Sequence, residues 1–143
     1  MANDFYTYYV NNLGLQTSTP PDMDTNTIKF VLTDHAGADG APNVATHDFY
    51  NDIDGSTVNS LSTALSSKTF GTLARGVFDA ADLSPAFSSV SGATVESISL
   101  LKDTGTPSSS DLICYWDTVT GLPLTPNGGD VNVTMNGSGI YKV

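Results

Sequence analysis

The sequence predicts a mainly β protein, an antiparallel β-sandwich or barrel with a short N-terminal helix and an extended arm. One observation is composition: only 14% of the residues are charged, and Glu96 is the only glutamate, while Ser, Thr, Asn and Gly are abundant. Ser and Thr are better suited to strands, turns and caps than to helix interiors. The other is periodicity: short alternating apolar segments recur between glycine and proline turns, which is typical of antiparallel sandwiches and barrels.

The length and the apolar content predict one folded domain. With 143 residues, of which 39% are apolar, the chain can bury a core and is unlike a disordered segment. We expect residues 1–27 to form the N-terminal helix and arm, and residues 28–143 to form a single β domain.

The first predicted element is a helix over residues 4–13, DFYTYYVNNL. Asn3 or Asp4 is placed to cap it and Gly14 to end it. Two prolines and no apolar pattern follow, so residues 14–27 are expected to be a loop or extended arm. Helical spacing gathers four residues into one apolar and aromatic face: Phe5, Tyr8, Tyr9 and Leu13.

The aromatic residues of this helix have two interpretations. A tyrosine buries its ring and keeps its hydroxyl group in water, as a helix on a sheet edge or at a subunit boundary requires. Contact inside the fold is the favoured interpretation, and contact with a partner is the alternative. The residues expected in a partner contact are Phe5, Tyr6, Tyr8 and Tyr9.

The next elements are a strand and a short helical turn. Residues 27–34, TIKFVLTD, alternate and predict a strand. Its expected apolar face is Ile28, Phe30 and Leu32, and its expected polar face is Thr27, Lys29 and Thr33. Residues 46–53, THDFYNDI, predict one helical turn that Thr46 caps and that ends at Asp54-Gly55.

The middle of the chain gives weaker signals. Residues 56–69 are ambiguous between strand and irregular structure. Residues 70–80, FGTLARGVFDA, predict a strand in which Gly71 and Gly76 mark bulges or a bend. Its expected common face is Phe70, Thr72, Ala74 and Phe78. A turn-rich connection is expected over residues 82–92.

The clearest strands close the chain, over residues 93–103, 111–118, 130–137 and 140–143. In the second of these, Leu112, Cys114 and Trp116 are expected on one face, opposite Ile113, Tyr115 and Asp117. Between the first two lies a polar loop, where Asp103, Thr104 and Gly105 are ordinary turn residues. This loop is therefore predicted to be a corner between neighbouring strands.

The net charge argues against two classes of partner. A formal net charge of −10, with five Lys and Arg residues, argues against binding nucleic acid or an anionic membrane.

The N-terminus lacks the basic and apolar regions of a signal peptide, and no run of eighteen apolar residues predicts a membrane span. We expect the chain to be made in a cytoplasm. A single cysteine, Cys114, predicts no disulfide framework and no cysteine metal cluster.

No catalytic or cofactor-binding residue is predicted, so we expect no enzyme. His35 and His47 are the only imidazoles, and both lie in or beside loops. A nucleophile elbow is missing, because the glycines around Ser138 in NGSGI have the wrong spacing. A phosphate loop is also missing.

The nearest approach to a metal motif is DFYNDIDG, residues 48–55. Asp52 and Asp54 precede Gly55 at the spacing of a calcium loop. Position one, however, is Tyr50 and position twelve is Leu61, so two ligands are missing. We therefore predict no metal site and interpret this stretch as a solvated acidic loop.

Several segments, in order, resemble one family. SISLLKDTGTPSSSDLICYWD (residues 97–117) and GGDVNVTMNGSGIYKV (128–143) resemble the closing strands of small virion proteins from tailed bacteriophages, labelled head decoration or cement proteins. DTNTIKFVLTD (24–34) and THDFYNDI (46–53) are similar to further motifs of that family. Residues 56–92 depart from the family pattern.

The resemblance implies a non-enzymatic structural protein on the exterior of the virion. Such a protein decorates the capsid, binds the major capsid protein and stabilises its shell, here as a homo-oligomer, most simply a homotrimer. The N-terminal helix and the arm are the expected contacts with the shell or a sister subunit. The alternatives are a tail, neck or fibre component of the virion and, from another class, a carbohydrate-binding module that uses Tyr115 or Trp116 in a groove.

Overall fold

A computed structural model describes residues 3–15 and 19–143 of the chain. Residues 16–18 of the predicted arm, and the first two residues, lie outside the described residues. Ten strands and one α-helix are present in the described part: β1 (Asp4–Phe5), α1 (Thr7–Leu15), β2 (Ile28–Thr33), β3 (Thr57–Leu61), β4 (Thr69–Phe70), β5 (Val77–Asp79), β6 (Leu83–Phe87), β7 (Ser97–Lys102), β8 (Leu112–Trp116), β9 (Val131–Val133) and β10 (Tyr141–Lys142).

The strands form three antiparallel sheets. The largest has five strands in the order β1-β8-β7-β2-β3, and the smaller sheets are β10-β5-β4 and β6-β9. The predicted mainly β class with antiparallel sheets is confirmed, and the sheets stack in a sandwich-like arrangement. Among the described residues no sheet closes into a barrel.

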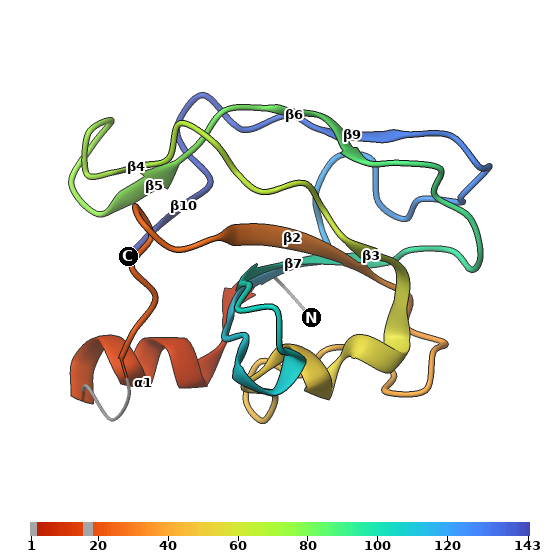
Figure 1. The fold of residues 1–143 in the computed structure, drawn as a ribbon, viewed down its shortest axis with the longest axis horizontal. Helices are drawn as coiled ribbons and strands as arrows, with labels where there is room; N and C mark the ends of the chain where they lie inside the picture. Colours follow the sequence, from red (N-terminus) through yellow and green to blue (C-terminus); the bar gives the residue numbers. More distant parts are fainter. Residues whose placement is uncertain (1–2, 16–18) are drawn as a thin grey trace.

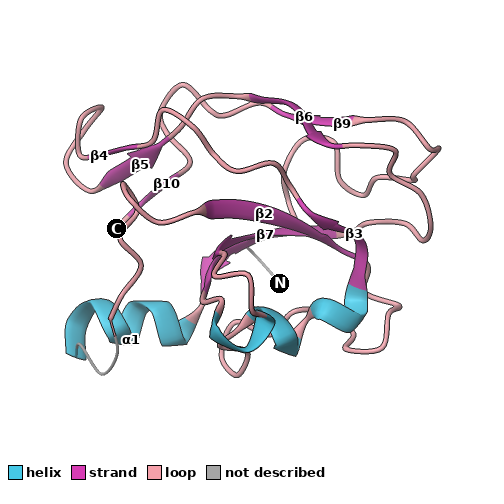
Figure 2. Ribbon diagram, in the orientation of Figure 1, coloured by secondary structure: helices cyan, strands magenta, loops and turns pink. Residues whose placement is uncertain are grey.

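The five-stranded sheet is the middle layer of the molecule (Figure 1). The two small sheets cover one of its faces, and α1 with the short 3₁₀-helices covers the other (Figure 2). Each face therefore has its own apolar cluster. Phe30 and Leu100 belong to the cluster under the small sheets, whereas Val31, Leu101 and Tyr6 belong to the cluster under the helices.

Burial on both faces corrects the predicted polar face of β2. The strand itself is confirmed at Ile28–Thr33. Thr33, expected on the polar face, is completely buried, and so is Val31 beside it. Alternation marks a half-buried strand, but β2 is covered by a second layer that its own sequence does not reveal.

A β-bulge in β8 corrects the predicted faces of that strand. Leu100 pairs with Cys114 and Leu101 with Leu112, so Ile113 is an extra residue in β8. The alternation changes face at this point. Leu112 lies in one apolar cluster and Cys114 in the other, although both were expected on one face.

The N-terminal helix begins later than predicted. Phe5 belongs to β1, which pairs with β8, and α1 starts at Thr7. Neither predicted cap acts as one, because Asn3 Oδ1 accepts hydrogen bonds from the Asp117 and Thr118 amides at 3.2 Å and Asp4 Oδ1 accepts one from the Phe5 amide at 2.8 Å.

The helical turn predicted at 46–53 is present as a 3₁₀-helix, Tyr50–Asp52. Asp52 rather than Thr46 caps it, because Asp52 Oδ2 accepts hydrogen bonds from the amides of Asp48 and Phe49 at 2.8 and 3.0 Å. Asp54-Gly55 does not end the helical structure, since a second 3₁₀-helix spans Asp54–Ser56.

Two predictions for the middle of the chain were wrong. Residues 70–80 form no single strand but the hairpin of β4 and β5. The bend predicted at Gly71 and Gly76 is confirmed, since they lie at the two ends of the hairpin loop, with φ of +78° and +75°. Such positive φ values turn the chain at little cost only at glycine. The turn-rich connection expected at 82–92 contains β6, which pairs with β9.

Candidate functional site

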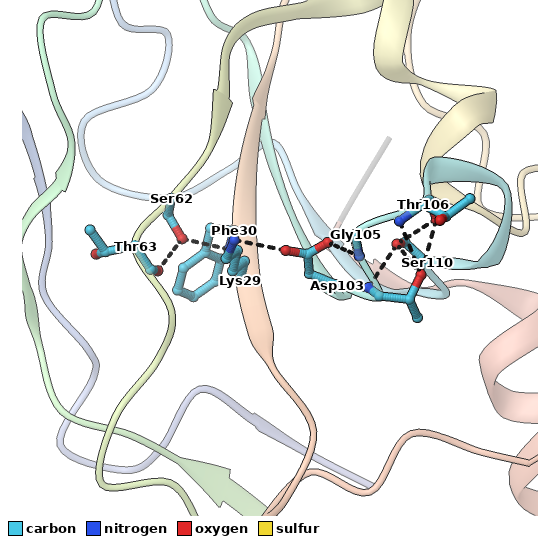
Figure 3. Close-up of polar contacts among 9 residues, drawn as sticks. Lys29, Phe30, Ser62, Thr63, Asp103, Gly105, Thr106 and Ser110 are labelled. Carbon is cyan, nitrogen blue, oxygen red and sulfur yellow. Dashed lines mark hydrogen bonds and ion pairs between the residues drawn. The ribbon is translucent and has the colours of Figure 1, made fainter.

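The loop between β7 and β8 is held by polar contacts within the loop and by an ion pair to β2 (Figure 3). Asp103 Oδ2 forms an ion pair with Lys29 Nζ of β2 at 2.7 Å, and Asp103 Oδ1 accepts a hydrogen bond from the Gly105 amide at 2.9 Å. Ser110 Oγ accepts the amide of Thr104 at 3.1 Å and donates to the Thr106 carbonyl at 2.9 Å. Because β7 and β8 pair directly, the predicted corner between neighbouring strands is confirmed.

Asp103 has a perturbed acidity. Burial by itself disfavours the carboxylate, but the hydrogen bonds from Lys29 and Gly105 outweigh it and hold the Asp103 pKa below its usual value. A second ion pair, Lys102 Nζ to Asp111 Oδ2 at 2.8 Å, closes the same loop at its base. These contacts fix the conformation of the corner.

The four aromatic residues expected in a partner contact occupy two different environments. Tyr6 and Tyr9 are buried inside the chain, at 0% and 1% exposure. Tyr6 Oη lies 3.0 Å from Ser99 Oγ, and Tyr9 Oη lies 3.0 Å from Tyr141 Oη. The favoured interpretation, contact inside the fold, is thus confirmed for these two tyrosines.

Burial raises the pKa of Tyr6, Tyr9 and Tyr141. This fits hydroxyl groups that find their partners away from water, Ser99 for Tyr6 and each other for Tyr9 and Tyr141. Phe5 and Tyr8 keep part of their surface exposed. The Phe5 ring meets Tyr141 edge-on at 5.2 Å, and the Tyr8 ring lies 5.0 Å from that of Phe49.

A polar cluster that the sequence did not reveal surrounds His35. His35 Nε2 lies 3.0 Å from Ser97 Oγ and 3.5 Å from Tyr115 Oη, and the His35 amide donates to Glu96 Oε2 at 2.9 Å. Burial, together with the nearby Asp117 carboxylate, raises the pKa of Tyr115 to about 12. Ser97 is completely buried, so its hydroxyl group is closed to a substrate.

The acidic loop around residues 48–55 uses its carboxylates for backbone hydrogen bonds. Asp52 caps the 3₁₀-helix, and Asp39 Oδ2 accepts the Gly55 amide at 2.7 Å. In the described part of the chain, no group of three or more His, Cys, Asp or Glu side chains is placed to hold a metal ion. Cys114 is buried. This burial and, to a smaller extent, the negative charge of Asp4 raise the pKa of its thiol well above the usual value.

An open cleft of about 680 Å³ separates part of the five-stranded sheet from the C-terminal segment. Phe30, Ile98 and Trp116 line its side on the large sheet, and Val131 and Met135 line the opposite side. The lining includes no charged residue. Of the two aromatic residues proposed for a carbohydrate groove, Trp116 reaches this cleft, whereas Tyr115 is buried in the other apolar cluster.

No protein-family model matches this chain, and no match is found among the curated proteins. Within the described residues, no helix has both the length and the apolar character needed to cross a membrane.

Proposed function

We propose that this chain is a non-enzymatic structural protein of a tailed-phage virion. In this role it is a capsid decoration or cement protein that binds the shell of the major capsid protein from outside and stabilises it. Its stabilising effect comes from buried contact area repeated over many sites, without any chemical step.

The observation that carries the proposal is the resemblance of four segments to such virion proteins, together with their place in the fold. Those segments contain β2, β7 and β8, the three consecutive inner strands of the large sheet, and also β9 and β10. The resemblance thus concerns the scaffold of the whole domain and not one loop.

The proposed partners are the major capsid protein and other copies of this chain, most simply in a trimer. Phe5 and Tyr8, which remain partly exposed, are the residues of the aromatic group that can still contact a partner. Nucleic acid is not a proposed partner, because a phosphate backbone is repelled by a chain of net charge −10.

The test is the number of copies of this chain per purified particle, measured by quantitative mass spectrometry against the major capsid protein. A ratio near one per capsid subunit, hence on the order of hundreds of copies, agrees with a decoration protein spread over the shell. A few copies to a few dozen would move the chain to the tail, neck or fibre. Absence from the particle would refute the virion role.

A carbohydrate-binding module is the second candidate, and the cleft favours it. Trp116 offers an aromatic surface there, and Thr118 and Asn132 are among the uncharged polar residues of the lining. Stacking on an aromatic ring with a few neutral hydrogen-bonding groups suits a neutral sugar. A glycan array tests this function: binding that Trp116→Ala abolishes would support it, and silence across the array would exclude it for the glycans displayed.

A further inference from the structure

The large apolar side chains that the described residues leave exposed are concentrated at one end of the molecule. Seven are exposed: Val10, Leu13, Leu15, Phe70, Leu73, Val119 and Val143. Three of them belong to α1, two to the β4–β5 hairpin and one to the residue after β10. In Figure 1 the C-terminal end of α1, this hairpin and the C mark all lie at the same end of the molecule.

Contacts between rings join these three elements. Tyr141 of β10 shares a hydrogen bond of 3.0 Å with Tyr9 of α1, and its ring centroid lies 6.5 Å from that of Phe70 in β4. The Val143 amide donates to the Gly76 carbonyl in the hairpin at 3.0 Å. We call the six residues other than Val119 the α1–hairpin surface.

The helix contributes an unusual part of this surface. None of its nine residues, TYYVNNLGL, is charged, although it is a surface helix of a chain with twenty charged residues. Its tyrosine Tyr9 faces the core, while Val10, Leu13 and Leu15 are 43–71% exposed. A surface helix normally places charged residues on its outer face, so an uncharged and apolar outer face favours contact with another protein.

The hairpin contributes the positive charge. Lys68, Arg75 and Lys142 lie in or beside β4, β5 and β10, with Asp79 as the acidic residue of the hairpin. The remaining cations, Lys29 and Lys102, are paired with Asp103 and Asp111, and Lys68 Nζ donates to the Asn26 carbonyl. Among the described residues, neither Arg75 nor Lys142 forms an ion pair.

This end is therefore where a second copy approaches at the lowest electrostatic cost. Two copies of net charge −10 repel each other, and the repulsion is least where the cations gather. The uncharged helix of one copy, moreover, does not repel the cationic hairpin of the next. Apolar side chains are present on both elements, so the contact buries apolar area on both sides.

We propose that copies of this chain associate through the α1–hairpin surface, with Val10, Leu13 and Leu15 of one copy against Phe70 and Leu73 of a second copy. If the helix and the hairpin of each copy both contact the same partner, the result is a two-fold dimer. If the helix of each copy contacts the hairpin of the next copy, the result is a closed ring such as a trimer. The inference rests on the homo-oligomer of the proposed function and not on capsid binding. If the chain self-associates but is absent from particles, the interface proposed here stands and the virion role is refuted.

Sedimentation of the purified full chain over a range of concentrations tests the interface. We expect an oligomer whose dissociation constant Leu73→Ser raises by about tenfold or more, because the substitution removes apolar area that the contact buries. The matched control is Val119→Ser, which removes an exposed apolar side chain outside this surface. A monomer at all concentrations, or equal weakening by both variants, would overturn the proposal.

The salt dependence of self-association distinguishes this contact from one in which the cations of one copy bind acidic loops of the next. We expect added salt to tighten the association, because it screens the repulsion between two acidic copies. Association that salt weakens would show that oppositely charged surfaces meet, and would refute the helix–hairpin contact.

Crosslinking tests the pairing without relying on a destabilising change. A Leu13→Cys variant is mixed with a Leu73→Cys variant, both carrying Cys114→Ala, and the mixture is oxidised. We expect a disulfide between the two different variants, and little when Leu13→Cys is mixed with a Val119→Cys variant. Equal yields in the two mixtures would count against the proposal, and circular dichroism confirms that each variant is folded.

Discussion

At the scale of single residues, the carboxyl group of Asp103 holds a strand and a turn together. One oxygen binds Lys29 on β2 at 2.7 Å, and the other accepts the amide of Gly105 at 2.9 Å. Both charged side chains are largely buried, at 24% and 13% exposure, so solvent screens the pair only in part. We expect Asp103→Asn to lower the free energy of unfolding by about 1–2 kcal/mol at neutral pH.

The pH dependence of this effect follows from the lowered pKa of Asp103. A carboxyl group with a lowered pKa in the folded state stabilises the fold above its ordinary pKa, about 3.9, and loses that contribution as the pH falls further. The difference between the wild type and Asp103→Asn should therefore shrink below about pH 4. Urea unfolding followed by Trp116 fluorescence at several pH values measures it. Asp24→Asn, an exposed carboxylate, is the control, and a difference that is constant down to pH 2 would contradict the assignment.

At the scale of elements, local alternation was enough to predict β2, β7, β8 and β9. It failed where the determining contact lies elsewhere in the chain. The sequence pattern of β6 suggests a turn because Pro85 follows Ser84, yet β6 has only one neighbouring strand and can accept a residue without an amide hydrogen. The bulge at Ile113 is set by pairing with β7, which the β8 sequence does not encode by itself.

The β4–β5 hairpin provides a matched pair of glycines. Both Gly71 and Gly76 have a positive φ, so alanine strains either position. A Cβ atom at Gly76 would also lie 2.6 Å from the backbone oxygen of Val143, whereas a Cβ at Gly71 meets nothing within 4 Å. We expect Gly71→Ala to cost about 1 kcal/mol of unfolding free energy and Gly76→Ala at least about 1 kcal/mol more. Thermal and urea unfolding compare them, and equal losses would mean that Val143 adapts freely.

At the scale of the whole molecule, the N-terminal segment is part of the sandwich. β1 pairs with β8, and Tyr6 and Tyr9 are buried in different apolar clusters. Helical spacing correctly placed Tyr9 on a packed face, but it left out Tyr6 and wrongly included Leu13, which is 43% exposed. The cluster around His35 was beyond prediction, because it depends on β2 and β7 being neighbours.

Deleting residues 1–15 should therefore destabilise the β domain and not only remove a contact surface. Losing a buried aromatic side chain costs about 3–5 kcal/mol, so losing two removes most of the stability of an ordinary domain. We expect no cooperative thermal transition by circular dichroism. Val10→Ser, on the exposed side of the same helix, should change the unfolding free energy by less than about 0.5 kcal/mol. A truncated chain that unfolds like the full one would show that the sheets are stable without this segment.

The hydrogen bond between Tyr9 and Tyr141 also has a consequence for synthesis. These residues are 132 positions apart, and each needs the other to bury its hydroxyl group. On the ribosome, Tyr9 emerges long before Tyr141, and β1 likewise waits for β8. Long-range pairings of this kind form slowly. The early aromatic residues of the nascent chain therefore stay unpaired until translation is nearly finished. During that interval they are exposed to a chaperone that binds apolar segments.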